Sequence, residues 1–368
     1  MNMKKTIKKI LLTILIIIST LVVLFGIYLL FSTITKYKPQ PEEVLELKGN
    51  KTLNVIDDNE FSVLSWNIGY CGLGKEMDFF YDGGKQVRPP LANYQGYLND
   101  VLNTLNKYAY VDFMFLQEVD LSSKRSYYSD QEELISKFLP AYGYAFAKNY
   151  DVKYVIMPPT EPMGKVKAGL MSLTKFQPTE LKRYSYPSSF TWPKKLLMLD
   201  RCLLLARYPL SNGKSLVMIN THNSAYDEEG ILRKVELDKL KTIITDEYNK
   251  GNYVLVGGDW NTNPPGFDPK TNFKNDKKEP INPPIDANYM PKDWKWFYDN
   301  SIPSERFTDE PYIKGKTKTT IIDFFLASPN IELSSVRTID LGFASSDHNP
   351  VLLNFKLLNL NSDTLQIK

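Results

Sequence analysis

Histidine and cysteine are both scarce in this chain, which has only two of each among its 368 residues. Cys71 and Cys202 form no Cys-x-x-Cys pair, and His222 and His348 form no His-Glu-x-x-His motif. Because protein zinc sites are built from such closely spaced ligands, this pattern argues against a zinc centre. A disulfide between the two cysteines and two free thiols are both compatible with the sequence.

The chain also lacks a strong net charge and internal repeats. Its formal net charge is +3, and subtracting the four lysines at positions 4, 5, 8 and 9 leaves about −1 for everything that follows. Proteins that bind nucleic acid over a broad surface carry an excess of positive charge. The composition therefore argues against a general nucleic-acid binder, although a local groove can still be basic.

Residues 10–31 form an uncharged, mostly apolar run near the N-terminus. At 1.5 Å per residue, a helix over this run is long enough to cross a hydrocarbon core of about 30 Å. No small-x-small cleavage signature follows it, so we expect an uncleaved anchor; a long secretory signal is the alternative. Because the four lysines precede the run, the positive-inside rule predicts a single-pass cell-membrane protein with residues 1–9 in the cytoplasm and the main body outside.

The remaining chain is predicted to contain one large domain. Residues 32–56 are polar and proline-bearing, which is typical of a stalk, and we expect a catalytic domain at 57–360 and a tail at 361–368. Apolar runs typical of buried strands alternate with amphipathic segments typical of helices, which predicts an α/β domain of sheets backed by helices. The predicted strands are 61–66, 112–116, 168–173, 202–207, 215–220, 253–256, 321–327 and 351–355, and the predicted helices are 91–109, 131–139 and 232–248.

Two further expectations concern local structure. On the last helix, we expect one buried apolar face formed by Leu232, Val235, Leu237, Leu240, Ile243 and Ile244. Residues 264–319 lack clear periodicity, and because long loops in compact domains are usually functional, we expect this segment near the site.

Polar side chains follow the predicted strands at the point where many of them end. A lone aspartate at a strand end is usually a cap or turn residue, and a lone histidine is often a surface residue. Several such clusters in one chain favour a shared site instead. The residues concerned are Asn67, Glu118, His222, Asp259, Asn261, Asp323, Asp347 and His348.

The residue types indicate phosphate chemistry with a hard cation. Mg²⁺ and Mn²⁺ prefer carboxylate, amide and water oxygens, so Asn67, Glu118 and Asp347 are candidate metal-site residues. Asp259 is the candidate base that activates a water molecule, and Asn261 would orient Asp259.

The two histidines are expected on either side of the phosphate. A histidine held by a carboxylate can bind or protonate a phosphate oxygen, and Asp323 with His348 would form such a pair. His222 would bind the phosphate from the opposite side.

The motifs resemble those of the endonuclease/exonuclease/phosphatase superfamily, in the expected order and over roughly residues 61–355. They are Ser65-Trp66-Asn67, Gln117-Glu118-Val119, Asn220-Thr221-His222, Gly258-Asp259-Trp260-Asn261, Ile322-Asp323-Phe324 and Ser346-Asp347-His348-Asn349-Pro350. The resemblance implies a four-layer α/β sandwich with two central mixed β-sheets flanked by helices, here preceded by a transmembrane helix. It also implies Mg²⁺- or Mn²⁺-dependent hydrolysis of phosphoester bonds, with Asn67 and Glu118 at the metal and Asn261 as a phosphate contact.

The chain departs from parts of the superfamily pattern. His222 is similar to a histidine of deoxyribonuclease-type members, where abasic-site enzymes have a tyrosine. Deoxyribonuclease-type members carry an arginine soon after the Gln-Glu-Val motif, but Asp120 follows here. This difference argues against DNA as substrate, whereas Lys124 and Arg125 could contact another phosphate.

Three functions are compatible with these features. The first is a membrane-tethered phosphodiesterase or nuclease acting on nucleic acid outside the cell. The second is a lipid or inositol-phosphate phosphoesterase, for which the anchor and an aromatic patch at 294–298 near the membrane would help. The third is a non-catalytic interaction scaffold. We expect a monomer, and the sequence does not indicate which phosphoester is cleaved.

Overall fold

The computed structural model describes residues 3–187, 190–227, 229–268 and 284–358; the predicted tail at 361–368 lies outside them. Two mixed sheets, each seven-stranded within these ranges, pack face to face. In order across the first sheet, the strands are β15 (Ile331–Thr338), β16 (Val351–Leu357), β3 (Glu60–Asn67), β4 (Phe113–Asp120), β6 (Gly164–Thr174), β5 (Gly143–Val155) and β2 (Lys48–Gly49). Across the second they are β1 (Glu42–Val44), β7 (Glu180–Ser185), β8 (Cys202–Pro209), β9 (Ser215–His222), β10 (Tyr253–Asp259), β14 (Asp323–Ala327) and β11 (Lys295–Phe297).

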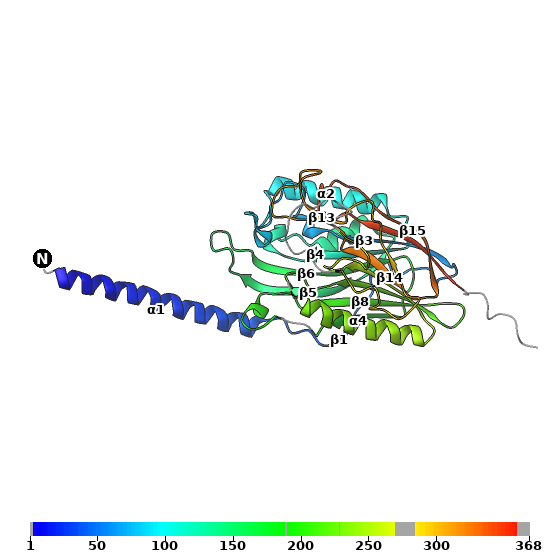
Figure 1. Ribbon diagram of the computed structural model, residues 1–368, viewed down its shortest axis with the longest axis horizontal. Coiled ribbons are helices and arrows are strands. Elements are labelled where there is room, and N and C mark those ends of the chain that lie inside the picture. The colour runs from blue at the N-terminus through cyan, green and yellow to red at the C-terminus, as the bar shows by residue number, and fades with distance from the viewer. Residues whose placement is uncertain (1–2, 188–189, 228, 269–283, 359–368) are drawn as a thin grey trace, which may run out of the picture.

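Helices cover the outer face of each sheet. Helices α2 (Leu91–Lys107) and α3 (Gln131–Phe138) pack on the first sheet, and α4 (Ile231–Asn249) packs on the second. Figure 1 shows α2 and α4 on opposite sides of the two sheets. The predicted four-layer α/β sandwich is thereby confirmed.

The alternation of side chains along the central strands explains the layers. On β10, Leu255 packs between the two sheets, while Val254 and Val256 point the other way, toward α4. A strand covered on both faces in this way reads as a continuous apolar run. This is why the central strands could be located from the sequence.

The expected face of α4 is wrong in part. Leu240 and Ile244 are buried, but Val235 is 37% exposed. Two charged residues, Arg233 and Glu236, are buried on this helix instead. Glu236 accepts hydrogen bonds from the backbone N–H and the hydroxyl of a residue that follows β9, so hydrophobic spacing alone could not find the buried face.

Several strands at or next to the edges of the sheets were not predicted. β5, β7 and β15 carry charged side chains along their length, which hides the apolar pattern. The segment expected to be a stalk also contributes strands, because β1 pairs with β7 and β2 pairs with β5. Residues 42–44 and 48–49 are therefore parts of the two sheets and do not form a separate linker.

A single helix, α1 (Met3–Thr35), projects from the sandwich at one end (Figure 1). Its segment Lys5–Thr35 is long and apolar enough to cross a membrane, with a mean hydropathy of 3.0 over an 18-residue window. Where the helix meets the domain, the Tyr28 hydroxyl donates to the Tyr154 carbonyl at 3.0 Å. Just beyond the helix, Lys36 Nζ lies 2.7 Å from Asp200 Oδ2. The C-terminal end of α1 is thus hydrogen-bonded to the domain.

The long segment at 264–319 is described except for residues 269–283. The aromatic residues at 294–298 do not form the exposed patch that was expected to help a lipid phosphoesterase. Trp294 and Phe297 are buried, and Trp296 packs against the rings of Trp260 and Phe324. Burial of these large rings stabilises the second sheet.

Candidate active site

Three neighbouring strands of the second sheet align the first group of site residues. In the register of β9, β10 and β14, Asp259 is paired with His222 on one side and with Asp323 on the other. Residues at the same level of adjacent strands point to the same face of a sheet. The imidazole and the two carboxylates are therefore brought into one row.

Two parallel strands of the first sheet supply the next residues. Asn67 ends β3 and is in register with Gln117 on β4. The pairing of β4 with β6 shifts between Leu116 and Val119, and Glu118 in that interval has a φ of 55°. Such bulges redirect side chains at functional sites. Here the bulge leaves Glu118 partly exposed, with 24% of its side chain accessible.

Hydrogen bonds join the two sheets at this end. Asn67 Nδ2 donates to Asp259 Oδ2 at 3.0 Å, and Gln117 Nε2 donates to Asn220 Oδ1 at 2.8 Å. All four residues are buried. Side chains from both sheets therefore meet in one polar cluster, which lies where the parallel strand pairs β3–β4 and β9–β10 end.

A glycine allows the two strands under the cluster to approach closely. Gly258 has a φ of 145°, and a Cβ atom there would lie 2.0 Å from the Thr221 carbonyl oxygen. No other residue fits without moving the backbone. The position of Asp259 thus depends on the glycine before it.

His348 is held by Asp323. Asp323 Oδ2 lies 2.7 Å from His348 Nδ1 and accepts a second hydrogen bond from Ser304 Oγ at 2.8 Å. Burial alone would lower the pKa of His348, but the carboxylates of Asp323, Asp347 and Asp259 raise it well above its usual value. The imidazole is therefore held in the protonated form.

Asp259 lies between both histidines. Its Oδ2 is 3.3 Å from His222 Nε2 and 3.9 Å from His348 Nε2, and its Oδ1 accepts from the Asn261 backbone N–H at 2.9 Å. Burial raises the pKa of Asp259 to about 7, against the opposing effect of His348. Burial, with the positive charges of Arg201 and His348, lowers the pKa of His222 well below its usual value, so that imidazole is neutral.

The sequence profile of the Endonuclease/Exonuclease/phosphatase family matches residues 64–348. The chain belongs to this family. No curated protein sequence matches the chain. Membership of this family supports phosphoester hydrolysis as the class of reaction for this chain.

Solved structures of the family share the fold of this member. The endonuclease/exonuclease/phosphatase from Beutenbergia cavernae DSM 12333 is 15% identical with a TM-score of 0.52, covering 82% of this chain and 72% of that chain. ANGEL2, described as a 2',3'-cyclic phosphatase, is 15% identical with a TM-score of 0.52, covering 86% and 98%. The human Nocturnin catalytic domain with bound sulfate is 14% identical with a TM-score of 0.50, covering 85% and 97%. At these identities the likeness shows the fold alone.

A divalent cation, which family members generally use, fits the acidic residues of this cluster. Burial and the carboxylates of Glu118 and Asp82 raise the pKa of Asp347 to about 6, and Arg306 and His348 only partly offset them. Among the described residues, no three His, Cys, Asp or Glu side chains form a ready metal cage. Asn67, Glu118 and Asp347 are the oxygen-bearing residues that would hold a Mg²⁺-type ion, which completes its coordination with water.

Asn261 lies in the cluster with its side chain turned toward the β9 end. Its Nδ2 donates to the Asn223 carbonyl at 2.9 Å, and its backbone has a φ of 49°. All eight residues singled out from the sequence belong to the same end of the sandwich.

Both cysteines are free and buried, which leaves no disulfide between Cys71 and Cys202.

Several residues of the cluster were missed from the sequence. Ser304 bonds to Asp323, and Glu305 forms an isolated bridge with His348. Burial and nearby carboxylates raise the pKa of Glu305 well above its usual value. These residues lie in the long aperiodic segment, so its expected place near the site is confirmed. The sequence indicated these residues only through their place in that segment.

The expectation that Arg125 could contact a substrate phosphate is wrong. Arg125 is 6% exposed, its Nη2 lies 3.0 Å from Asp120 Oδ1, and its guanidinium stacks 3.7 Å from the Tyr70 ring centre. Lys124 Nζ donates to the Pro162 carbonyl at 2.7 Å. Because Asp120 and Arg125 neutralise each other inside the protein, Arg125 serves the fold and is not available to bind a substrate phosphate.

Proposed function

We propose that this protein is a metal-dependent phosphoester hydrolase that α1 tethers to the cell membrane. The observation that carries the proposal is the position of Asp259, within 4 Å of both histidines and bonded to Asn67. A carboxylate that contacts an imidazolium and a candidate metal residue has the surroundings of a general base.

Asp259 takes the proton from the attacking water in this mechanism. A general base works best when its pKa is near the working pH, and burial raises that of Asp259 to about 7. The backbone N–H of Asn261 and the amide of Asn67 hold the two carboxylate oxygens in place. The base is therefore oriented before substrate binds.

The two histidines bind the phosphate in different protonation states. His348, protonated and held by Asp323, donates a hydrogen bond to a phosphate oxygen and stabilises the charge that develops there. Neutral His222, with its proton on Nε2, donates either to Asp259 Oδ2, which lies 3.3 Å away, or to the phosphate.

A Mg²⁺ or Mn²⁺ ion bound by Asn67, Glu118 and Asp347 would neutralise charge on the phosphoryl group. The protein's own contribution is to keep these oxygen ligands together in a buried place. Asn67 Oδ1 accepts a hydrogen bond from the Gly69 N–H at 3.0 Å, which fixes the amide orientation.

The membrane location is part of the proposal. The helix α1 would cross the bilayer once, with residues 1–9 in the cytoplasm and the sandwich outside as a monomer. The domain would comprise the sandwich together with the edge strands at 42–49.

Among substrates, a phosphoester at the membrane surface is favoured over extended nucleic acid. Lys36, which follows the C-terminal end of α1, donates hydrogen bonds to the Met198 carbonyl and to Asp200. The same segment continues into Arg201, whose charge acts on His222. The end of the anchor is thus hydrogen-bonded to a segment that borders the candidate site. Arg125, by contrast, is paired with Asp120 inside the fold.

A substrate panel on the full-length protein in detergent micelles tests the proposal. We expect Mg²⁺- or Mn²⁺-dependent release of product from at least one of DNA, RNA, sphingomyelin, a phosphoinositide and a soluble inositol phosphate. The Asp259→Asn variant is the matched control and should be inactive on the same substrate. Absence of metal-dependent turnover on every substrate would favour the interaction-scaffold alternative.

A further inference from the structure

A small hollow lies beside the candidate site, between the end of β9, the start of α4 and the segment before β8. Its empty volume is about 270 Å³, including space open to solvent. Because this volume includes open solvent, the enclosed part of the hollow is smaller, and only a small group would fit there. It is lined by Phe190, Met198, Leu199, Arg201, Ser224, Ala225 and Leu232.

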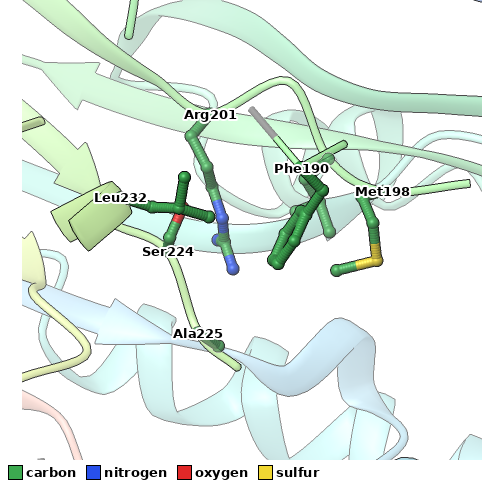
Figure 2. A pocket seen from close by; sticks show the side chains of 7 residues that line it. Phe190, Met198, Arg201, Ser224, Ala225 and Leu232 are labelled. Atoms are coloured by element: carbon green, nitrogen blue, oxygen red, sulfur yellow. The ribbon is translucent and has the colours of Figure 1, made fainter. Parts of the chain in front are cut away.

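Arg201 is the charged residue of the hollow, and its guanidinium points into the space between Phe190 and Leu232 (Figure 2). The residue is only 8% exposed, and Nη1 is buried with no hydrogen-bond partner among the described residues. No described carboxylate forms an ion pair with it. Leaving a guanidinium N–H buried without a hydrogen-bond partner is unfavourable, so this position favours binding of an anionic ligand.

The backbone around the hollow is fixed on both sides. Arg201 precedes β8, which pairs with β9, and its carbonyl accepts from the Tyr186 N–H at 2.9 Å. On the other side, Ser224 donates from its N–H to Glu236 at 2.8 Å, and its carbonyl accepts from Arg233 at 3.2 Å. The backbone at Arg201 and at Ser224 is therefore hydrogen-bonded into the fold.

The hollow adjoins the reaction centre. Ser224 follows His222 by two residues, and the Arg201 charge helps to lower the pKa of His222, after the effect of burial. An anionic group bound at Arg201 would thus be a near neighbour of a substrate phosphate bound by the histidines.

We propose that this hollow is a subsite for a second phosphate group of the substrate and that Arg201 is its binding residue. The inference depends on the proposed hydrolase function and adds the class of substrate. A guanidinium binds phosphate through paired N–H donors, and the apolar walls formed by Phe190, Met198 and Leu232 reduce competition from water. The second phosphate belongs either to a phosphorylated lipid headgroup or to a soluble bisphosphate.

Binding of simple bisphosphates tests the subsite without turnover. Calorimetric titration of the full-length protein in detergent with Mg²⁺ would compare alkanediol bisphosphates of increasing chain length with the matching alkyl monophosphates. We expect the best bisphosphate to bind about tenfold more tightly than its monophosphate. Arg201→Met should abolish this preference, and Arg201→Lys should reduce it.

The matched control is Lys195→Met. Lys195 is an exposed lysine of the same segment and does not line the hollow, so its loss should leave the preference unchanged. If Arg201→Met does not fold, Arg201→Lys decides, because it keeps the charge but loses the paired donors. Equal preference in wild type and Arg201→Lys would then overturn the proposal, as would the absence of any preference in the wild type.

Turnover distinguishes the two sources and separates this inference from the proposed function. Mixed micelles with phosphatidylinositol 4-phosphate or phosphatidylinositol, and soluble inositol phosphates with one or two phosphates, would be compared by kcat/KM. An Arg201-dependent preference for the extra phosphate in either form supports the subsite. Hydrolysis without such a preference overturns the subsite alone, and Arg201-dependent binding without hydrolysis overturns the hydrolase alone.

Discussion

Asp323 and His348 stand 25 positions apart in the chain, yet Asp323 Oδ2 and His348 Nδ1 are 2.7 Å apart. The aspartate comes from β14 of the second sheet, and the histidine precedes β16 of the first. Their contact therefore bridges the two halves of the sandwich. It also orients the imidazole, so that Nε2 is 3.9 Å from Asp259 Oδ2.

His348→Ala should lower kcat by about 100-fold or more, because it removes the charged donor to the phosphate. Steady-state kinetics on the substrate found in the panel would measure this. Thermal unfolding of the variant should remain cooperative, which separates a chemical from a structural effect. Activity close to that of the wild type would remove His348 from the mechanism.

Asp259→Asn should also lower kcat by about 100-fold or more, since an amide cannot accept the proton of the attacking water. The amide is similar in size, so the contacts to Asn67 and Asn261 can be kept. Rate measurement across a pH series is the test. A variant that keeps the wild-type rate and pH profile would show that another group is the base.

Removal of divalent metal with EDTA should abolish activity, and Mg²⁺ or Mn²⁺ should restore it. Glu118→Gln should raise the Mg²⁺ concentration needed for half-maximal activity by about tenfold or more, because a charged oxygen ligand is lost. Titration of the apo protein with metal would measure this. Full activity in EDTA would contradict the assignment of Asn67, Glu118 and Asp347.

Glu247→Gln should lower the free energy of unfolding by about 1–3 kcal/mol at neutral pH. Glu247 on α4 binds Arg207 on β8 at 2.7 and 3.0 Å, and despite burial, these bonds and those from Lys250 and Asn252 lower its pKa from 4.5 to about 2. The lowered pKa stabilises the protein above pH 4.5, and this contribution is lost as the pH falls toward 2. Urea unfolding at pH 7 and pH 3 should therefore show a smaller difference between variant and wild type at pH 3.

The control for this prediction is Glu133→Gln. Glu133 pairs with Lys137 on the exposed face of α3, with 59% of the Glu133 side chain accessible. Exposed pairs of this kind contribute about 0.3–0.5 kcal/mol, so this variant should change stability little at either pH. Equal losses in the two variants would mean that burial of Glu247 does not matter.

Asp120→Ala should destabilise the fold by about 3–5 kcal/mol, because it leaves the Arg125 guanidinium buried without its partner. Thermal or urea unfolding would measure the loss. An unchanged unfolding midpoint would show that the stacking of Arg125 on Tyr70 is sufficient by itself.

The strands that carry the site could be predicted because each is buried on both faces. β9 and β10 contain continuous apolar runs that end at His222 and Asp259, so both the strand and its polar end are visible in sequence. β5 could not be found in this way, since Lys148, Asp151 and Lys153 interrupt its pattern. Their charges are satisfied by one another, which only the folded chain reveals.

The sequence alone determined the α/β class, the apolar N-terminal helix and the polar residues at the strand ends, because local residue type and spacing encode them. The four-layer arrangement was expected from the resemblance of the motifs to the family. Tertiary structure decided which charges remain available. It paired Arg125 with Asp120 and left Arg201 Nη1 without a hydrogen-bond partner among the described residues, although both are arginines near polar clusters in the chain. Whether a buried charge finds a partner depends on contacts between distant segments, and spacing along the chain does not record them.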